Sequence, residues 1–423
     1  MLTTKDPRLA GRVAFNYPNF VSYTLARFFI VVALEMQSVA VGWQVYEITK
    51  RPLDLGYVGL AQFLPGFVLF LFAGHAADRL DRRKLLMACY AGYGLCSALL
   101  LAISWRAPHS VHAIYVVLVL VGTFRSFSFP VSRAILPHLV PEEHFANAVA
   151  WNASTFQIAT IAGPAIGGIA YAAFHGPEAV YAIAVTVSVL STIFTLRIHP
   201  LPTSPEKELA EKEPVSLRTV LAGLHFMWEK KLILGSLSLD MFAVLLGGAV
   251  SLLPIYARTI LRTGPWGLGV LRAAPGVGAA LMAIVVAHRP IRRRAGLTML
   301  VAVAAFGVFT IVFGISHNLV LSLAALFLTG AADMVSVIIR ATLIQVATPD
   351  EMRGRVNAVD MLFIGVSNEL GEFESGLTAQ WFGTVPAVVL GGVGTLLVIA
   401  TWAWLFPELR KADELTVTEL MPK

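Results

Sequence analysis

Apolar residues in this chain gather into about twelve separated blocks, each close to 20 residues long. An α-helix needs about 20 apolar residues to cross a bilayer core of roughly 30 Å. Only 14% of the residues are charged, whereas a soluble domain has roughly 25%, so the chain cannot be soluble. The blocks predict an all-α membrane protein with twelve transmembrane helices, at approximately 19–46, 55–77, 85–105, 112–132, 147–174, 178–197, 232–256, 267–287, 295–315, 318–339, 356–382 and 386–406.

One long hydrophilic connection divides these spans into two sets of six. We expect an N-terminal six-helix bundle at 1–197, a cytoplasmic linker at 198–230, and a C-terminal six-helix bundle with a short cytoplasmic tail at 231–423. Apolar residues at helical spacing in the last part of the linker predict an amphipathic helix on the cytoplasmic surface. These residues are Leu217, Val220, Leu221, Leu224 and Met227.

The positions of the lysines and arginines predict the orientation of the chain. With both termini in the cytoplasm, most basic residues fall on the cytoplasmic side, including the clusters at 78–84 and 289–294. The net charge of +6 then reflects membrane topology and indicates no nucleic-acid partner. No apolar h-region precedes the first span, so we expect that span to anchor the chain itself. We expect a multi-pass protein of a bacterial inner membrane, working as a monomer.

The two halves of the chain resemble each other in sequence. Matching stretches occur in the same order in both halves, with offsets of 205 to 210 residues. Any one match has little weight alone, but the ordered series indicates duplication of a six-span unit. The matches are "EMQSVAVG" (35–42) with "DMFAVLLG" (240–247), "GLAQFLPG" (59–66) with "GVLRAAPG" (269–276), the basic triplets ending at Lys84 and Arg294, and "PEEHFANAV" (141–149) with "PDEMRGRVNAV" (349–359).

Two motifs in the first half resemble those of one transporter family. "GHAADRLDRRK" (74–84) is similar to the signature that the major facilitator superfamily carries between spans two and three, although Asp81 stands where the general pattern has glycine. "GPAIGG" (163–168) is similar to the antiporter motif of members that export. The matching residues are Gly74, Asp78, Arg79, Arg82 and Arg83 in the first motif, and Gly163, Pro164, Gly167 and Gly168 in the second.

This resemblance implies the major facilitator fold, two pseudo-symmetric six-helix bundles, and the branch of enterobactin-exporter-like and drug–proton antiporters. It implies that the first motif is a conformational latch, in which Asp78 accepts hydrogen bonds from arginine and caps a helix end. The alternative is ordinary positive charge on the cytoplasmic side. In the second motif, glycines permit close helix contact and Pro164 bends the span. The alternative there is small-residue packing without bearing on the direction of transport.

Acidic residues inside the expected spans are candidates for proton coupling, because a charge in hydrocarbon is costly and usually functional. Glu35 and Asp240 occupy equivalent places in the repeat, in spans that face the central cavity of the family's fold. The alternative for both is a structural hydrogen bond. Asp333 is a third candidate, with Arg340 or Arg353 as possible ion-pair partners.

Polar residues near these acids are candidates for the substrate cavity. Gln37 lies close to Glu35 in the first span. Arg125 lies near the middle of the fourth span, where the resembled family often carries a cavity arginine, but Phe129 replaces the glycine usual four residues later. The match at Arg125 is therefore partial.

The stretch "SNELGEFESG" (367–376) places three glutamates in an otherwise apolar segment. Glu369 and Glu372 lie about 60° apart on a helix, and Asn368 extends the same polar arc, whereas Glu374 is roughly 100° or more away. We expect Glu369 and Glu372 to exchange protons at the cavity, with Asn368 at the substrate. Glu374 is a candidate for a structural pair with a basic or hydroxyl partner. The alternative is one polar network between helices.

No sequence motif indicates an enzyme, a cofactor or a metal site. The chain has no GxxxxGK[ST] nucleotide loop, no HExxH and no CxxC. Transport must then be driven by an ion gradient or by the gradient of the substrate itself. We expect a secondary transporter that exports an amphipathic small molecule, such as a drug or siderophore, in exchange for protons. The alternatives are transport of a lysophospholipid or similar solute, and a transport-inactive membrane sensor or scaffold.

Overall fold

The computed structural model describes residues 11–107, 109–199, 217–291 and 293–412. Within some described helices a few side chains, including that of Asp78, lie outside the description. Eleven helices among the described residues are long and apolar enough to cross a membrane. Helix α15 (Asp350–Phe382) is also long enough, but it carries more charged residues and is the least apolar of the long helices. The all-α membrane class predicted from the apolar blocks is confirmed.

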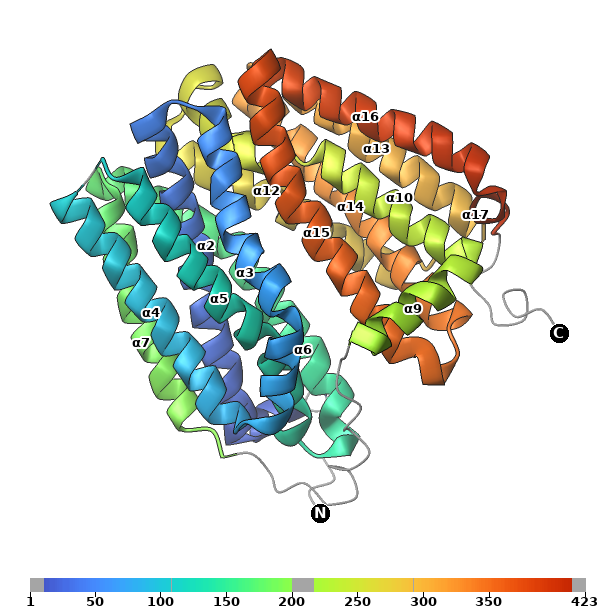
Figure 1. Ribbon diagram of the computed structural model, residues 1–423, viewed down its shortest axis with the longest axis horizontal. Helices are drawn as coiled ribbons and strands as arrows, with labels where there is room; N and C mark the ends of the chain where they lie inside the picture. Colours follow the sequence, from blue (N-terminus) through green and yellow to red (C-terminus); the bar gives the residue numbers. More distant parts are fainter. Residues whose placement is uncertain (1–10, 108, 200–216, 292, 413–423) are drawn as a thin grey trace. The chain divides into compact units, whose positions relative to one another are not determined.

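By its internal contacts the chain divides into two compact units (Figure 1). Unit 1 comprises Met1–Val41 and Leu64–Pro214. Within it α4 packs against α5 and α7, and α6 packs against α7. Its helices are α2 (Pro18–Thr49, as far as Val41), α3 (Pro52–Arg79, from Leu64), α4 (Arg82–Arg106), α5 (Val111–Ile135), α6 (Phe145–Phe174) and α7 (Pro177–Leu196), with 3-10 turns η1 (Val13–Asn16), η2 (Leu136–His138) and η3 (Glu142–His144).

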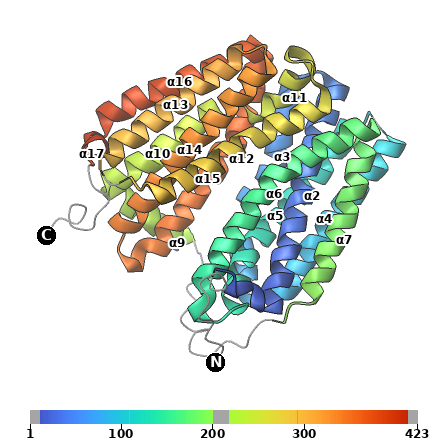
Figure 2. The same ribbon diagram turned by 180° about the vertical axis from the view of Figure 1, so that it is seen from behind.

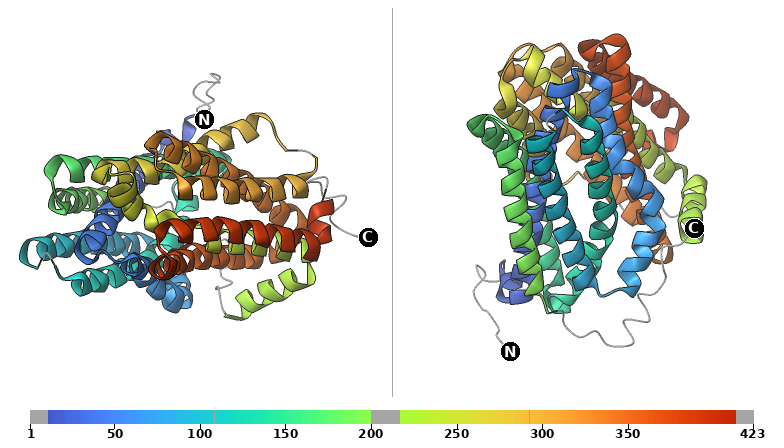
Figure 3. Two further views of the ribbon diagram at one scale, coloured as in Figure 1. Left: turned by 90° about the horizontal axis from the view of Figure 1, so that it is seen from above. Right: turned by 60° about the vertical axis from the view of Figure 1, so that its left-hand side comes forward.

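Unit 2 comprises Gly42–Phe63 and Val215–Lys423, so the end of α2 and the start of α3 belong to it. Within it α13 packs against α14 and α16, and α12 packs along α14 (Figure 2). Two further views show the same side-by-side helices (Figure 3). Its remaining elements are α9 (Leu217–Glu229), α10 (Lys231–Gly247), η4 (Val250–Leu252), α11 (Leu253–Ile255), the π-helical η5 (Tyr256–Ile260), α12 (Gly264–His288), α13 (Ala295–Ile315), α14 (Leu319–Ala347), α15, α16 (Thr384–Leu405) and α17 (Pro407–Lys411).

Helix α9 occupies the amphipathic end of the linker. Its Met227 is fully buried in a cluster with Ile233 and Val356, so this part of α9 packs on α10 and α15. The backbone of α9 also approaches α15 closely, because a Cβ on Gly223 would lie 2.7 Å from the Arg355 carbonyl oxygen. Leu221, by contrast, is 54% exposed. The apolar side of α9 is thus divided between the helical bundle and the surface.

The seventh span is interrupted, although the sequence suggested a continuous helix at 232–256. Helix α10 ends at Gly247, and the chain continues through η4, α11 and the π-helical η5. Consecutive glycines at 247 and 248 lower helix propensity, and Pro254 lacks a backbone donor. The Gly248 carbonyl, freed by the interruption, accepts a 2.7 Å hydrogen bond from the Ser375 hydroxyl of α15. Such a partner is what an irregular backbone needs at membrane depth.

Helices α12 and α14 cross at glycines, where no side chain separates the two backbones. A Cβ on Gly330 would collide with the Pro275 backbone, and one on Gly278 with the Phe327 carbonyl. Small residues allow such close approach in membranes, where packing contributes much of the attraction between helices. This crossing holds the two helices together near their middles.

We predict that Gly330→Leu destabilises the protein by about 1–3 kcal/mol, because the side chain has no space against the Pro275 backbone. Gly365→Ala is the matched control, since nothing lies within 4 Å of its added Cβ, and it should stabilise by roughly 0.5–1 kcal/mol through helix propensity. Melting temperatures in detergent would compare them. Equal melting temperatures for Gly330→Leu and wild type would contradict the tight crossing.

Candidate functional site

One face of α14 carries a polar strip inside the membrane-spanning part of unit 2. Asp333, Ser336 and Arg340 follow one another at positions i, i+3 and i+7, so they share that face. Arg340 is 4% exposed, and Ser336 is fully buried. A buried guanidinium needs anionic partners, because an unpaired charge is costly away from water.

Two other helices supply those partners. The Arg340 Nη2 atom lies 3.4 Å from Oδ2 of Asp240 on α10, and its Nη1 forms an ion pair with Asp360 on α15. Ser336 adds a long 3.5 Å hydrogen bond from its hydroxyl to Oδ1 of Asp240. Arg340 therefore links α10, α14 and α15 through one side chain.

The cluster contains more acid than base. Asp333 lies near enough to Asp240 and Arg340 for both charges to act on it. Two carboxyl groups thus pair with the guanidinium, and the charge of a third lies close to the pair. The Arg340 Nε is buried and has no hydrogen-bond partner among the described residues. The arrangement has an unused donor and an excess of negative charge when every carboxyl is ionised.

The sequence pointed to only part of this cluster. Asp240 and Asp333 were expected as proton-coupling candidates, and Arg340 as a possible partner of Asp333. Asp360 was missed, although an acid directly after the repeated Asn-Ala-Val at 357–359 was a usable signal. Arg353, the other expected partner, is exposed and donates to the Gln345 carbonyl at 3.5 Å.

Glu35, the repeat counterpart of Asp240, has different surroundings. Glu35 is half-buried on α2 and lies against α6. A Cβ placed on Gly163 of α6 would be 2.5 Å from the Glu35 Cβ. Its neighbour Gln37 is 3% exposed and accepts a 2.6 Å hydrogen bond from the Ser97 hydroxyl of α4. Gln37 thus joins two helices of unit 1, and its cavity role stays a prediction.

The second motif, "GPAIGG", forms the contact surface of α6 towards α2. A Cβ on Gly167 would lie 2.7 Å from the Met36 Cα, and Gly163 faces Glu35. Gly163, Pro164, Gly167 and Gly168 are all buried. Only glycine allows the two backbones to come this close. The motif therefore sets the α2–α6 spacing inside unit 1.

Comparison with known proteins gives the family. A family model described as Major Facilitator Superfamily matches residues 23–372. The chain belongs to the major facilitator superfamily.

Curated relatives and solved structures agree with this membership. The chain is 28% identical to the enterobactin exporter EntS of Citrobacter koseri and 27% identical to that of Shigella boydii, each over 94% of both chains. Among solved structures, a bacterial homolog of the human lysosomal transporter Spinster matches with a TM-score of 0.73 at 12% identity, covering 92% of this chain and 96% of that one. The Escherichia coli xylose transporter XylE matches with 0.69 at 11% identity, covering 96% and 100%.

These structural likenesses show the fold, and the family shows a multi-pass transporter of small molecules that is not an enzyme. Among the residues that the structure describes, no group of three or more His, Cys, Asp or Glu is placed to hold a metal ion.

Two arginines of the motif at 74–84 contact other residues of unit 1. The Arg82 guanidinium donates to the Ala134 carbonyl at 3.2 Å and contacts His138, and Arg83 donates to the Leu196 carbonyl. Both carbonyls lie at helix C-terminal ends, where cations are favourable. Arg79 is exposed and Gly74 half-buried, while the Asp78 side chain lies outside the described part. The latch across the halves stays a prediction.

The glutamates of α15 occupy separate environments. Glu372 lies against α3, with its Oε2 atom 2.6 Å from a Cβ placed on Gly59. Glu369 is half-buried, and Asn368 is exposed and donates to the Ile364 carbonyl of its own helix. Glu374 accepts a 2.6 Å hydrogen bond from the Thr378 hydroxyl one turn later.

In unit 1 the substrate candidate Arg125 is exposed on α5. It lies near Tyr93, whose hydroxyl is 2.8 Å from the hydroxyl of Ser128. The sequence-predicted residues are thus spread over two units, and Asp240 and Asp333 are the candidates that the described structure brings together.

We predict that Arg340→Met destabilises the protein by about 3–5 kcal/mol, because two buried carboxylates lose their shared cation. Adding Asp240→Asn and Asp360→Asn should recover part of the loss, since neutral amides need no counter-charge. Arg410→Met on α17 is the control; Arg410 is exposed, and its loss should change stability by at most about 0.5 kcal/mol. Detergent melting curves measure all three. Equal losses for Arg340→Met and Arg410→Met would disprove the buried pairing.

Proposed function

We propose that this chain is a secondary active transporter that works by alternating access and exports an amphipathic small molecule in exchange for protons. The observation that carries the proposal is the cluster of Asp240, Asp333 and Asp360 around Arg340. A purely structural protein gains little from so many costly charges within the membrane. This consideration disfavours a sensor or scaffold without transport activity.

The charge balance suggests how protons act. Three ionised carboxyl groups leave excess negative charge that one guanidinium cannot compensate, and burial makes that excess unfavourable. Uptake of a proton by one carboxyl reduces the excess, uptake by a second removes it, and release of the protons restores it. Because Asp240 and Asp360 sit on different helices, protonating either one releases Arg340 from α10 or from α15. Protonation thereby alters which helices are tied together.

The direction and the substrate are proposed from the relatives and the motif. The curated relatives are named as enterobactin exporters, so enterobactin is the first compound to test. The "GPAIGG" motif supports export. We further propose an inner-membrane monomer with both termini in the cytoplasm, in agreement with the distribution of its lysines and arginines.

We predict that Asp333→Asn and Asp360→Asn abolish accumulation driven by a pH gradient, because neither amide can load a proton. Downhill exchange of substrate should remain, since the substrate site is intact. Enterobactin flux in proteoliposomes, with and without the gradient, measures both. Glu374→Gln is the control, because a neutral amide can still accept the Thr378 hydrogen bond. Unchanged uphill transport in Asp240→Asn, Asp333→Asn and Asp360→Asn would remove the cluster from coupling.

We predict from the signature motif that Asp78→Asn reduces transport at least several-fold while the protein stays folded and inserted. The amide weakens hydrogen bonds that a carboxylate accepts from arginine. Asp81→Asn is a close control, because Asp81 caps α4 through the Lys84 amide at 3.0 Å and asparagine caps equally well. Flux at matched expression decides the matter. Full transport by Asp78→Asn would exclude a latch at this residue.

A further inference from the structure

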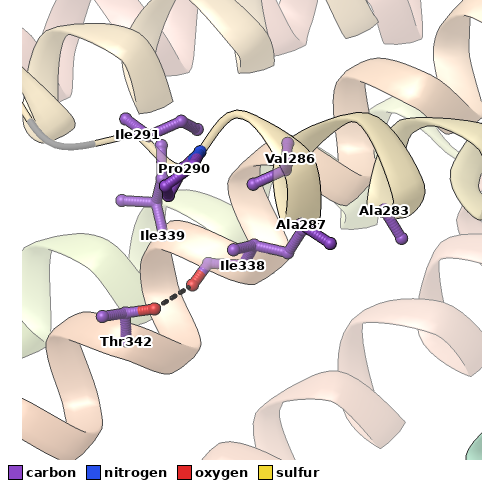
Figure 4. A pocket seen from close by; sticks show the side chains of 8 residues that line it. All are labelled: Ala283, Val286, Ala287, Pro290, Ile291, Ile338, Ile339 and Thr342. Carbon is purple, nitrogen blue, oxygen red and sulfur yellow. Dashed lines mark hydrogen bonds between the residues drawn. The ribbon is translucent and has the colours of Figure 1, made fainter. Parts of the chain in front are cut away.

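Helices α12 and α14 both line a pocket towards the C-terminal end of each. The glycine crossing at Gly278 and Gly330 holds them together further along. Beyond it lies a pocket of about 460 Å³, within the range of roughly 300–1,000 Å³ typical of ligand pockets. Figure 4 shows side chains of α12, of the chain just after it, and of α14 around the pocket.

Seven of the eight side chains that line this pocket are apolar. Val286 and Ala287 contribute from α12, Pro290 and Ile291 from the following turn, and Ile338 from α14. The one polar side chain is Thr342, whose hydroxyl already donates to the Ile338 carbonyl at 2.8 Å, as the dashed line in Figure 4 marks. The lining side chains therefore suit an apolar chain.

The pocket borders a face of α12 suited to lipid. Leu281, Ile284 and Val285 are 50%, 55% and 52% exposed. Apolar side chains so exposed on a membrane-spanning helix are in place to contact acyl chains. Ala287 of the pocket lies one turn after Ile284 and about 60° from it on the helical surface, whereas Ala283 is turned by about 100° or more from all three of these residues. The exposed lining residues Ala287 and Pro290 mark the side from which an acyl chain would enter the pocket.

Two basic residues stand at the end of the pocket. Arg289 and Arg293 flank the pocket residues Pro290 and Ile291, and both are exposed. Neither forms an ion pair with any described residue. Because α12 ends at His288, these arginines lie where the span ends, at the level of lipid headgroups. Basic pockets between transmembrane helices near the membrane surface are suited to anionic headgroups.

We propose that this pocket binds an anionic phospholipid of the surrounding bilayer. One acyl chain occupies the space between α12 and α14, and the headgroup phosphate lies between Arg289 and Arg293. The proposal is independent of the transported substrate and of proton coupling. It assigns to unit 2 a lipid site that stabilises the ends of the two helices.

The test adds lipid to the full-length protein in detergent and measures the melting temperature. Phosphatidylglycerol should raise it by several degrees more than phosphatidylcholine with the same acyl chains. Inorganic phosphate and glycerol 3-phosphate should give no shift, because they cannot fill the pocket. Native mass spectrometry should show one phosphatidylglycerol retained at low lipid excess.

Two variants separate the parts of the site, each compared with its own melting temperature in phosphatidylcholine. Arg289→Gln with Arg293→Gln should lose the extra shift, and Ala283→Trp should reduce it by filling the pocket. Arg410→Gln with Lys411→Gln removes two exposed charges of α17 and should keep the shift. Equal stabilisation by both lipids, or by free phosphate, would overturn the proposal. A full shift in Ala283→Trp would overturn the acyl-chain site.

Discussion

The burial of one guanidinium among carboxylates is the interaction on which the arrangement of unit 2 depends. Arg340 is 4% exposed and cannot be solvated by lipid, so Asp240 and Asp360 must stay within reach. This requirement fixes the rotation of α10 and α15 about their axes relative to α14. A change in the charge of the cluster therefore also changes the contacts that hold the three helices together. A device that couples protons to motion needs that property.

Close backbone approach is the second constraint, and it acts where charge is absent. In lipid the hydrophobic effect does not drive helices together, so van der Waals contact and small residues contribute more. Gly330 against Pro275 in unit 2, and Gly167 against Met36 in unit 1, are such contacts. The pocket at the end of α12 lies beyond the glycine contacts of α12 and α14, towards the C-terminal end of both helices.

The sequence predicted the spans well because length and apolarity are local properties. The block expected at 295–315 is α13 (Ala295–Ile315). The sequence did not predict the interruption after Gly247, because a glycine pair alone is tolerated in a helix. The break also depends on Ser375 of α15, which satisfies the freed Gly248 carbonyl. Asp360 was missed for the same reason: its role depends on Arg340, 20 residues earlier on another helix. Contacts between helices cannot be read from the periodicity of either one.

The sequence repeat shows how similar stretches acquire different tasks. The basic loops that end at Lys84 and Arg294 are equivalent in the repeat. In the first, Arg82 and Arg83 turn towards the bundle and donate to carbonyls near the ends of α5 and α7. In the second, Arg289 and Arg293 are exposed beside an apolar pocket. The preference for basic residues on the cytoplasmic side is met whether their side chains turn towards the helical bundle or away from it. Because topology leaves that orientation open, packing decides whether a guanidinium caps a helix or faces a lipid phosphate.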